Sequence, residues 1–284
     1  MTELREPMTI EEMQVELGLC REGCPDIRLA FRDHELWAAE HRQWMLSPEG
    51  LRANELVELI REAEESAKRM RDEAAAEHTY EQRLGDLARR TFEAWFSGDD
   101  AYRADRERIA LGCERWAQRV VSGEWEGGAV RTLVLSSPAT GVGKTHLSLS
   151  VLRRLAVAGM SWQRWNVVEL LTMLRTSSHG RQESHDAAQV LRACQACDVL
   201  LLDDLGTQRG TDWELERLYE IVNARWERQL WTIGTANASE YVDLARGTDG
   251  DSHSLHVRRI ASRLQDGGHV LVFGRDWPGW RASR

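Results

Sequence analysis

The stretch Pro138–Thr145, which reads PATGVGKT, follows a short apolar strand at 132–135 and is typical of a loop that grips phosphate. Its lysine stands out, because only two of the chain's 37 lysine and arginine residues are lysines. A compact ammonium on a flexible stem reaches the β- and γ-phosphates from inside a tight loop, where a planar guanidinium would not fit. The sequence therefore predicts that Lys144 belongs to a nucleotide-binding loop.

The neighbours of Lys144 favour the same interpretation. Gly141 and Gly143 let the backbone turn and present its N–H groups to an anion. Thr145 is expected to open a helix whose N-terminus favours negative charge, and to offer its hydroxyl to Mg²⁺. The residues predicted to contact the nucleotide are Ala139, Thr140, Gly141, Val142, Gly143, Lys144, Thr145 and His146.

A second segment, Asp198–Gly206 (DVLLLDDLG), supplies acidic side chains. Its four apolar residues at 199–202 suit a strand that is buried on both faces of a parallel sheet. Asp203 and Asp204 follow at the carboxyl end of that strand, where α/β sheets place their ligands. In P-loop ATPases the first such aspartate holds the Mg²⁺ of the nucleotide complex. A core strand followed by an Asp-rich turn is the alternative, and the phosphate loop upstream favours the metal site.

Composition sets further bounds on the class of protein. With 284 residues, 42% of them hydrophobic and 29% charged, the chain is typical of a globular protein of one or two domains. No apolar run approaches the roughly 20 residues that span a bilayer. The first residues, MTELREPMTI, are acidic and lack the basic and then apolar pattern of a secretion signal. We therefore expect a cytoplasmic protein that does not engage a membrane.

Charge is divided unevenly along the chain. Residues 1–128 hold 18 basic and 29 acidic side chains, a net charge of −11, whereas residues 129–284 hold 19 and 17, a net of +2. The acidic part is poorly suited to binding nucleic acid, and it is a suitable docking surface for a protein partner. Residues 258–284 contain six arginines against two aspartates, which favours a local basic face that meets nucleic acid.

Two cysteine pairs invite a metal interpretation. Cys194 and Cys197 have Cys-x-x-Cys spacing, but no second pair stands at zinc-ribbon spacing, so buried inert thiols are favoured. Cys20 and Cys24, with histidines downstream, leave a small zinc site open as an alternative.

Hydrophobic periodicity predicts a helical N-terminal region that starts at Ser47-Pro48 and continues to residue 119, with a break near 97–98. Strands and helices then alternate, which predicts a parallel α/β sheet in three layers. The expected strands are 132–136, 162–166, 199–202, 230–234 and 269–273, and the expected helices are 145–158, 167–176, 186–196, 212–228 and 255–264.

Two further elements can assist phosphate chemistry. Asn237 ends the strand that follows the Asp203 strand, where an amide can hydrogen-bond the attacking water or the γ-phosphate; any strand-ending turn also suits asparagine. Arg258, Arg259 and Arg263 share one helical stretch, RRIASRL. A guanidinium stabilises charge on a transferring phosphoryl group, although arginine is common throughout this chain.

From about residue 113 to residue 280 the chain resembles the DnaC/DnaI-type helicase loaders, AAA+ ATPases related to the transposition helper IstB. The matching segments are GVGKTHL at 141–147, DVLLLDDLG at 198–206, TDWELERLYEIVNARWE at 211–227, TIGTAN at 232–237, RRIASRL at 258–264 and VFGRDW at 272–277. The resemblance implies an AAA+ P-loop domain at 111–284 and a helical, partner-docking region at 1–110. It also implies ATP and Mg²⁺ as ligands.

The resemblance assigns roles to single residues. Lys144 and Thr145 would bind the triphosphate and Mg²⁺, Asp203 would hold the metal, and Asn237 would be the first sensor. Arg263 would be an arginine finger that reaches a neighbouring subunit, which implies a homo-oligomer. Asp204 takes the catalytic place where many AAA+ enzymes have glutamate; because its side chain is shorter by one methylene, we expect slow turnover.

The function implied is an ATP-dependent loader of a replicative hexameric helicase that contacts single-stranded DNA through residues 167–196. A transposition helper of the IstB type is one alternative. A nucleotide-binding adaptor with little hydrolysis is another, because Pro138 replaces the first glycine of the loop pattern and removes a backbone donor.

Overall fold

The computed structural model describes residues 48–92, 103–124, 131–176, 185–206, 211–237, 252–266 and 268–273. The chain divides into two compact units, Met1–Asp72 and Glu73–Arg284, and helix α4 (Pro48–Leu84) runs from the first into the second. The predicted division of roles between residues 1–110 and 111–284 stays a prediction. The predicted Cys20/Cys24 zinc site lies outside the described residues, as do the VFGRDW residues beyond Phe273.

In the first unit the structure describes Pro48–Asp72, which forms the start of α4 as the Ser47-Pro48 signal predicts. Leu59 and Met70 are exposed, and Arg61 forms an ion pair with Glu58, three residues earlier and also exposed. This is the solvated, charged helix surface that the composition indicates.

Helix α4 ends at Leu84, well before the break near 97–98 that the sequence predicts. Gly85 adopts a left-handed φ of 52°, which glycine tolerates without a steric penalty and which stops an α-helix. A 3₁₀ turn, η1 (Gly85–Arg89), follows, and the backbone is extended at Arg90. The next described helix is α6 (Arg103–Ser122), and the expected break itself falls in the undescribed stretch 93–102.

The second unit contains a sheet of five parallel strands, as predicted. These are β1 (Thr132–Ser136), β2 (Trp162–Asn166), β3 (Val199–Leu205), β4 (Trp231–Ala236) and β5 (Gly268–Val272), in the order β2-β3-β4-β1-β5. Because all neighbours are parallel, the carboxyl ends of the strands meet at one edge of the sheet. The acidic residues and the loop that the sequence singles out lie at that edge.

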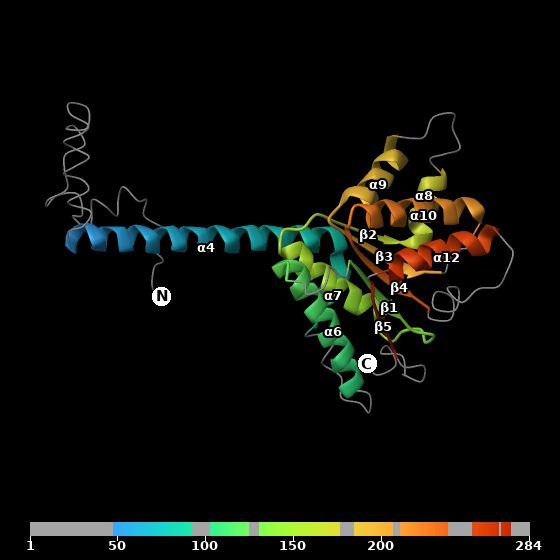
Figure 1. The fold of residues 1–284 in the computed structure, drawn as a ribbon, viewed down its shortest axis with the longest axis horizontal. Helices are drawn as coiled ribbons and strands as arrows, with labels where there is room; N and C mark the ends of the chain where they lie inside the picture. The colour runs from blue at the N-terminus through green and yellow to red at the C-terminus, as the bar shows by residue number, and fades with distance from the viewer. Residues whose placement is uncertain are drawn as a thin grey trace. The chain divides into compact units, whose positions relative to one another are not determined.

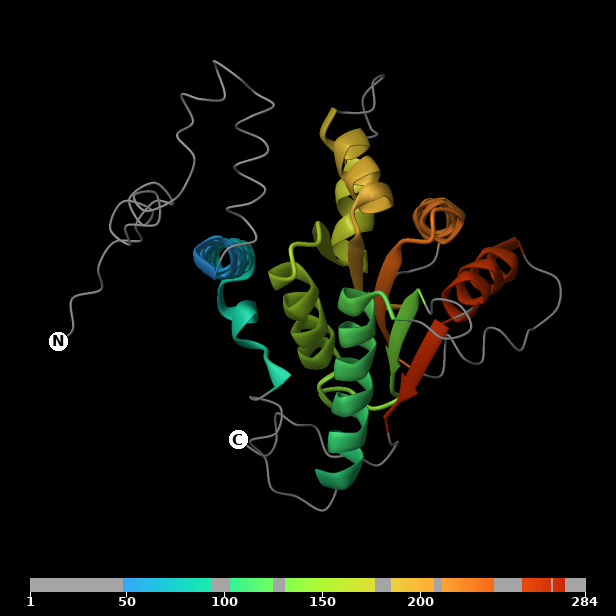
Figure 2. The same cartoon turned by 60° about the vertical axis from the view of Figure 1, so that its left-hand side comes forward.

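Helices cover both faces of the sheet and make three layers (Figures 1 and 2). Helix α6 and α7 (Lys144–Val157) pack on one face. The other face is covered by α8 (Val167–Thr176), α9 (His185–Ala196), α10 (Asp212–Glu227) and α12 (Ser252–Gln265). Neighbouring residues of β3 alternate between the layers: Leu201 faces α7, and Leu200 and Leu202 face the other side.

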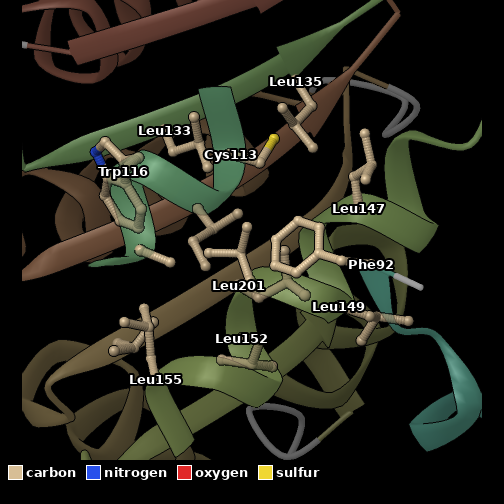
Figure 3. Close-up of a cluster of buried hydrophobic side chains, with 14 of the residues drawn as sticks. Phe92, Cys113, Trp116, Leu133, Leu135, Leu147, Leu149, Leu152, Leu155 and Leu201 are labelled. Atoms are coloured by element: carbon tan, nitrogen blue, oxygen red, sulfur yellow. The ribbon is translucent and has the colours of Figure 1, made fainter. Parts of the chain in front are cut away.

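The core on the α7 face joins side chains from α6, α7, β1 and β3 (Figure 3). Phe92, which follows η1, lies among the leucines of α7 and the sheet, and Trp116 of α6 meets the Trp231 ring edge-on at 5.8 Å. Each such buried side chain contributes roughly 1.5–3 kcal/mol. The phosphate loop joins β1 to α7, so this packing holds it from both ends.

Arg225 of α10 is fully buried at the opposite end of the sheet from the phosphate loop. Its guanidinium donates to the carbonyl oxygens of Cys194, Cys197, Asp198 and Trp231 and to the Thr232 hydroxyl. It thereby satisfies backbone acceptors at the carboxyl end of α9 and at the starts of β3 and β4. Cys194 and Cys197 are free and buried, as predicted, and burial raises the pKa of the Cys194 thiol to about 12.

Within the described ranges, no helix has the length and apolar character needed to cross a membrane. The same residues contain no group of three or more His, Cys, Asp or Glu side chains that could hold a metal ion by themselves.

Candidate functional site

The loop between β1 and α7 has the backbone that a phosphate cradle requires. Gly141 and Gly143 adopt φ values of 74° and 97°, which a residue with a Cβ rarely reaches. Gly143 is the N-cap of α7, so the helix starts at Lys144 and aims its unpaired N–H groups at the loop. Such an arrangement is suited to binding an anion.

Lys144 is buried inside this loop, where its ammonium donates to the carbonyl oxygens of Ala139 at 3.0 Å and Ser137 at 3.4 Å. Burial lowers the pKa of Lys144, and the carboxylates of Asp204 and Asp203 oppose that shift. Both carbonyl partners hold the ammonium within the loop. The lysine is thus positioned before any ligand arrives.

Asp203 is the centre of the site. Its Oδ1 accepts hydrogen bonds from the hydroxyls of Thr145 at 2.9 Å and Thr235 at 2.7 Å, and its Oδ2 accepts one from Arg164 Nη2 at 3.0 Å. A hydroxyl beside a carboxylate suits Mg²⁺, which protein sites hold through one or two carboxylates together with substrate phosphates. Thr145 and Asp203 would hold the ion, whose charge would polarise the phosphate oxygens.

Both carboxylates reach the same cavity because β3 is irregular at this point. Successive residues of a regular strand point to opposite faces. Here the pairing of β3 with β4 shifts register between Leu202 and Leu205, and Asp204 adopts a left-handed φ of 61°. The N–H of Asp204 donates to the Thr235 hydroxyl at 2.9 Å, so one buried threonine contacts both acidic residues.

Asp204 is half-buried, and its carboxylate accepts a hydrogen bond from Asn166 Nδ2 at 3.2 Å. Burial raises the pKa of Asp204, and the neighbouring Asp203 charge raises it further; Lys144, Arg164 and Asn166 lower it. The side-chain Oδ1 of the same Asn166 accepts the N–H groups of Val168 and Glu169 in the first turn of α8. This asparagine therefore connects an acidic residue of the site to the start of α8.

These side chains surround a cavity of about 690 Å³, within the range of pockets that hold nucleotide-sized ligands. Its lining residues are Leu87, Arg90, Thr140, Gly141, Gly143, Lys144, Thr145, His146, Arg164, Asn166, Asp203, Asp204 and Asn237.

Most of the residues that the sequence predicts for the site line this cavity. The exceptions are Ala139, which holds Lys144 through its carbonyl; Val142, which is buried in the core; and Arg263. Their roles toward a nucleotide remain predictions.

Arg263 lies near the end of α12, away from the cavity. Its guanidinium stacks on the Trp226 ring at 3.9 Å, and its Nε donates to Asn223 Oδ1 at 3.1 Å. It also lines a separate hollow at the end of the sheet where β1 and β4 begin. It is therefore not placed to reach the cavity of its own subunit, and a role there would need a neighbouring copy.

Sequence reasoning missed four lining residues: Leu87, Arg90, Arg164 and Asn166. Leu87 and Arg90 belong to the segment after α4, which buried residues of α7 hold in place: His146 Nε2 lies 2.7 Å from the Thr91 oxygen, and the Ser150 hydroxyl donates to the Arg90 oxygen. Arg164 and Asn166 lie on β2, two residues apart and hence on one face. Polar residues at period two in a strand were the only available signal.

Comparisons with known proteins agree with this geometry. Residues 120–241 match the family model of the IstB-like ATP binding protein. A curated relative, the uncharacterized protein YdaV of Escherichia coli K12, is 27% identical over 144 residues, which cover 50% of this chain and 52% of the relative. The matched part thus spans about half the length of that relative.

A solved structure has the same fold. The crystal structure of DnaI superposes with a TM-score of 0.50 and 23% identity, covering 68% of this chain and 92% of that one. The DnaC helicase loader gives a TM-score of 0.48 at 18% identity, covering 67% and 99%. The predicted AAA+ P-loop fold is confirmed, and so is the resemblance to IstB-like ATP-binding proteins over the matched residues.

Proposed function

Because residues 120–241 match the IstB-like ATP-binding proteins, we propose that this protein is an ATPase of the AAA+ class that loads a replicative hexameric helicase onto single-stranded DNA. The observation that supports it most is the contact of 2.9 Å between Thr145 and Asp203, which joins the phosphate loop to the acidic strand. A triphosphate with Mg²⁺ needs both elements at once.

The residues of the cavity divide the chemistry of ATP hydrolysis among them. Loop N–H groups and Lys144 bind the phosphates, and Thr145 and Asp203 bind the metal. Asp204 orients the attacking water, with Asn237 beside it at the end of β4. Because the aspartate is short and its carboxyl is held by Asn166, hydrolysis is slow, which suits a switch between two states better than a motor.

The partners follow from the resemblance and from charge. The N-terminal helical region, residues 1–110, docks on the helicase, and residues 167–196 contact single-stranded DNA. The protein acts as a homo-oligomer, because Arg263 completes the site of a neighbour. ATP binding favours the engaged state, and hydrolysis releases the partner.

The experiment measures phosphate release by the full-length protein with and without single-stranded DNA, and in parallel the capture of the replicative helicase of the same organism. We expect slow hydrolysis that DNA stimulates, and capture that requires ATP. Lys144→Ala should bind no nucleotide and remove both effects, because the loop loses its only cation. Nucleotide binding without turnover in either condition would instead favour an adaptor.

The family match favours a second candidate, a transposition helper that marks target DNA for a transposase. The ATP site serves both functions equally. Capture of a transposase encoded beside this gene, with no capture of the helicase, would replace the loader by the helper. The ATP chemistry above would remain unchanged.

A further inference from the structure

Arg164 carries a charge into the cavity that the ATPase chemistry described above does not use. It lies on β2, its side chain is 19% exposed, and its guanidinium lines the cavity beside Lys144 and Thr145. The position follows from strand geometry. Asn166 pairs with Asp203 across β2 and β3, and Arg164 shares the face of Asn166, so both reach the acidic residues.

The contact of Arg164 with Asp203 competes with a metal ion. The guanidinium occupies Oδ2 at 3.0 Å, and the hydroxyls of Thr145 and Thr235 occupy Oδ1. A carboxylate that receives three donors has little capacity left for a further cation. When Asp203 turns to the metal, Arg164 loses its anionic partner while its side chain remains largely buried.

A buried guanidinium without an anion is costly, so Arg164 requires a second partner in the loaded site. Its Nε is already buried with no hydrogen-bond partner in the part of the chain that the structure describes. The anion that arrives with the metal is the phosphate chain. The guanidinium of arginine presents a planar fork of N–H donors, which matches the geometry of phosphate oxygens.

We infer that Arg164 is a phosphate-binding residue of its own subunit, which leaves Asp203 when the metal binds and takes the terminal phosphate of ATP. This inference rests on the proposed ATPase function. It assigns to β2 a catalytic residue that contacts the transferring group, in addition to the finger expected from a neighbouring subunit. Its consequence is a preference for ATP over ADP within a single subunit, because ADP lacks the group that Arg164 binds.

The test compares the affinities of the full-length protein for Mg·ATP and Mg·ADP, measured by displacement of a fluorescent nucleotide. Arg164→Met should lower the affinity for ATP about tenfold or more, because it removes charge-assisted hydrogen bonds, and should leave that for ADP nearly unchanged. The Mg²⁺ concentration that half-saturates ADP binding should fall, because Asp203 no longer has an internal competitor. The affinity for ATP thus falls while the affinity for Mg²⁺ rises.

A purely structural ion pair would behave differently: the variant would lose ATP and ADP affinity equally and would need more Mg²⁺. That result would overturn the inference, as would unchanged affinity for ATP. Arg153→Gln is the matched control, since it breaks a part-buried ion pair with Glu77 that lies outside the cavity, and it should alter neither affinity.

If Arg164→Met does not fold, Arg164→Lys decides instead. It keeps the charge but loses the fork, so the preference for ATP over ADP should fall, and an unaltered preference would refute the assignment. A wild-type protein that binds no ATP would refute the ATPase function itself, whereas normal wild-type binding with an unaffected variant refutes only the role of Arg164.

Discussion

At the scale of single residues, the site stores unfavourable free energy at Asp204. Burial and the neighbouring Asp203 raise the pKa of this carboxyl above its ordinary 3.8, and the residue also adopts a left-handed φ of 61°. Both features cost the folded state free energy, and both accompany the position of the carboxylate in the cavity. Such strain is typical of a functional position, where geometry has been kept at the expense of stability.

Asp204→Asn is therefore expected to abolish hydrolysis while stabilising the fold at neutral pH. Asparagine tolerates the left-handed conformation and carries no charge to desolvate. Because the folded-state pKa lies above the unfolded one, the gain is absent well below pH 3.8, grows as the pH rises from 3.8 to the folded-state value, and is constant above it. We expect at most about 1 kcal/mol, since the group is partly solvated.

The measurement is urea unfolding of Asp204→Asn and the wild type at several pH values, without nucleotide. A stability difference that is independent of pH, or that grows toward acid, would contradict the assignment of the raised pKa to Asp204.

Thr235 is the second residue on which the site depends. It is fully buried, its hydroxyl donates to Asp203 and it accepts the N–H of Asp204. Thr235→Val keeps the shape but leaves both groups short of a partner, so the free energy of unfolding should fall by about 1–3 kcal/mol. Nucleotide affinity should fall with it. Thr235→Ser retains the hydroxyl and should keep the affinity; if Ser and Val behave alike, the hydrogen bonds are not the cause.

At the scale of elements, the sequence predicts the fold well and the site only in part. The alternation of strands and helices from Thr132 onward predicts the parallel three-layer sheet, because apolar runs such as 199–202 suit little else. The strand order does not follow from any local pattern. The sequence did not predict the end of α4, because the charged, helical pattern continues on both sides of Gly85. A single glycine lowers helix propensity by only about 1 kcal/mol, so it ends a helix only where tertiary packing also favours the end.

The site shows the same limit. The loop and the Asp203–Asp204 pair are contiguous in sequence and were therefore predictable. Arg164 and Asn166 reach those aspartates from 39 and 38 residues away, across strands that only the fold brings together. The register shift in β3 was equally hidden, because it depends on the pairing with Thr235 and not on the composition of β3.

Helix α10 offers a test of an element boundary. Thr211 and Glu214 form a capping box, in which the Thr211 hydroxyl accepts the Glu214 N–H and the Glu214 carboxylate accepts the Thr211 N–H. Thr211→Ala should lower the free energy of unfolding by about 1 kcal/mol. Urea denaturation should show a lower midpoint with an unchanged slope. Thr211→Ser is the control and should be nearly neutral; an equal loss for serine would point to packing of the methyl group.

At the scale of the whole molecule, the proposed homo-oligomer requires a contact between Arg263 and the site of a neighbouring subunit. Arg263 stacks on Trp226 and bonds Asn223 of its own chain, outside the nucleotide cavity. These contacts hold the guanidinium in a defined orientation at the surface of α12. A head-to-tail assembly, in which the surfaces on the two sides of each interface differ, would let it enter the neighbour's site.

Mixing two inactive variants tests this arrangement. Lys144→Ala lacks a working nucleotide site but keeps its finger, whereas Arg263→Ala keeps the site and loses the finger. Each alone should bring hydrolysis close to background. In equal, randomly mixed oligomers about a quarter of the interfaces pair an intact site with an intact finger, so activity should recover toward about a quarter of the wild-type rate.

Arg259→Ala is the matched control, because this arginine lies on the same helix and rests near the Tyr219 ring at 5.8 Å. It should retain wild-type hydrolysis. No recovery on mixing, with both variants folded and able to assemble with the wild type, would mean that the finger does not act between subunits. Full activity of Arg263→Ala alone would remove Arg263 from the chemistry altogether, and the nucleotide site would then have to work with the charges of a single chain, Lys144 and Arg164 among them.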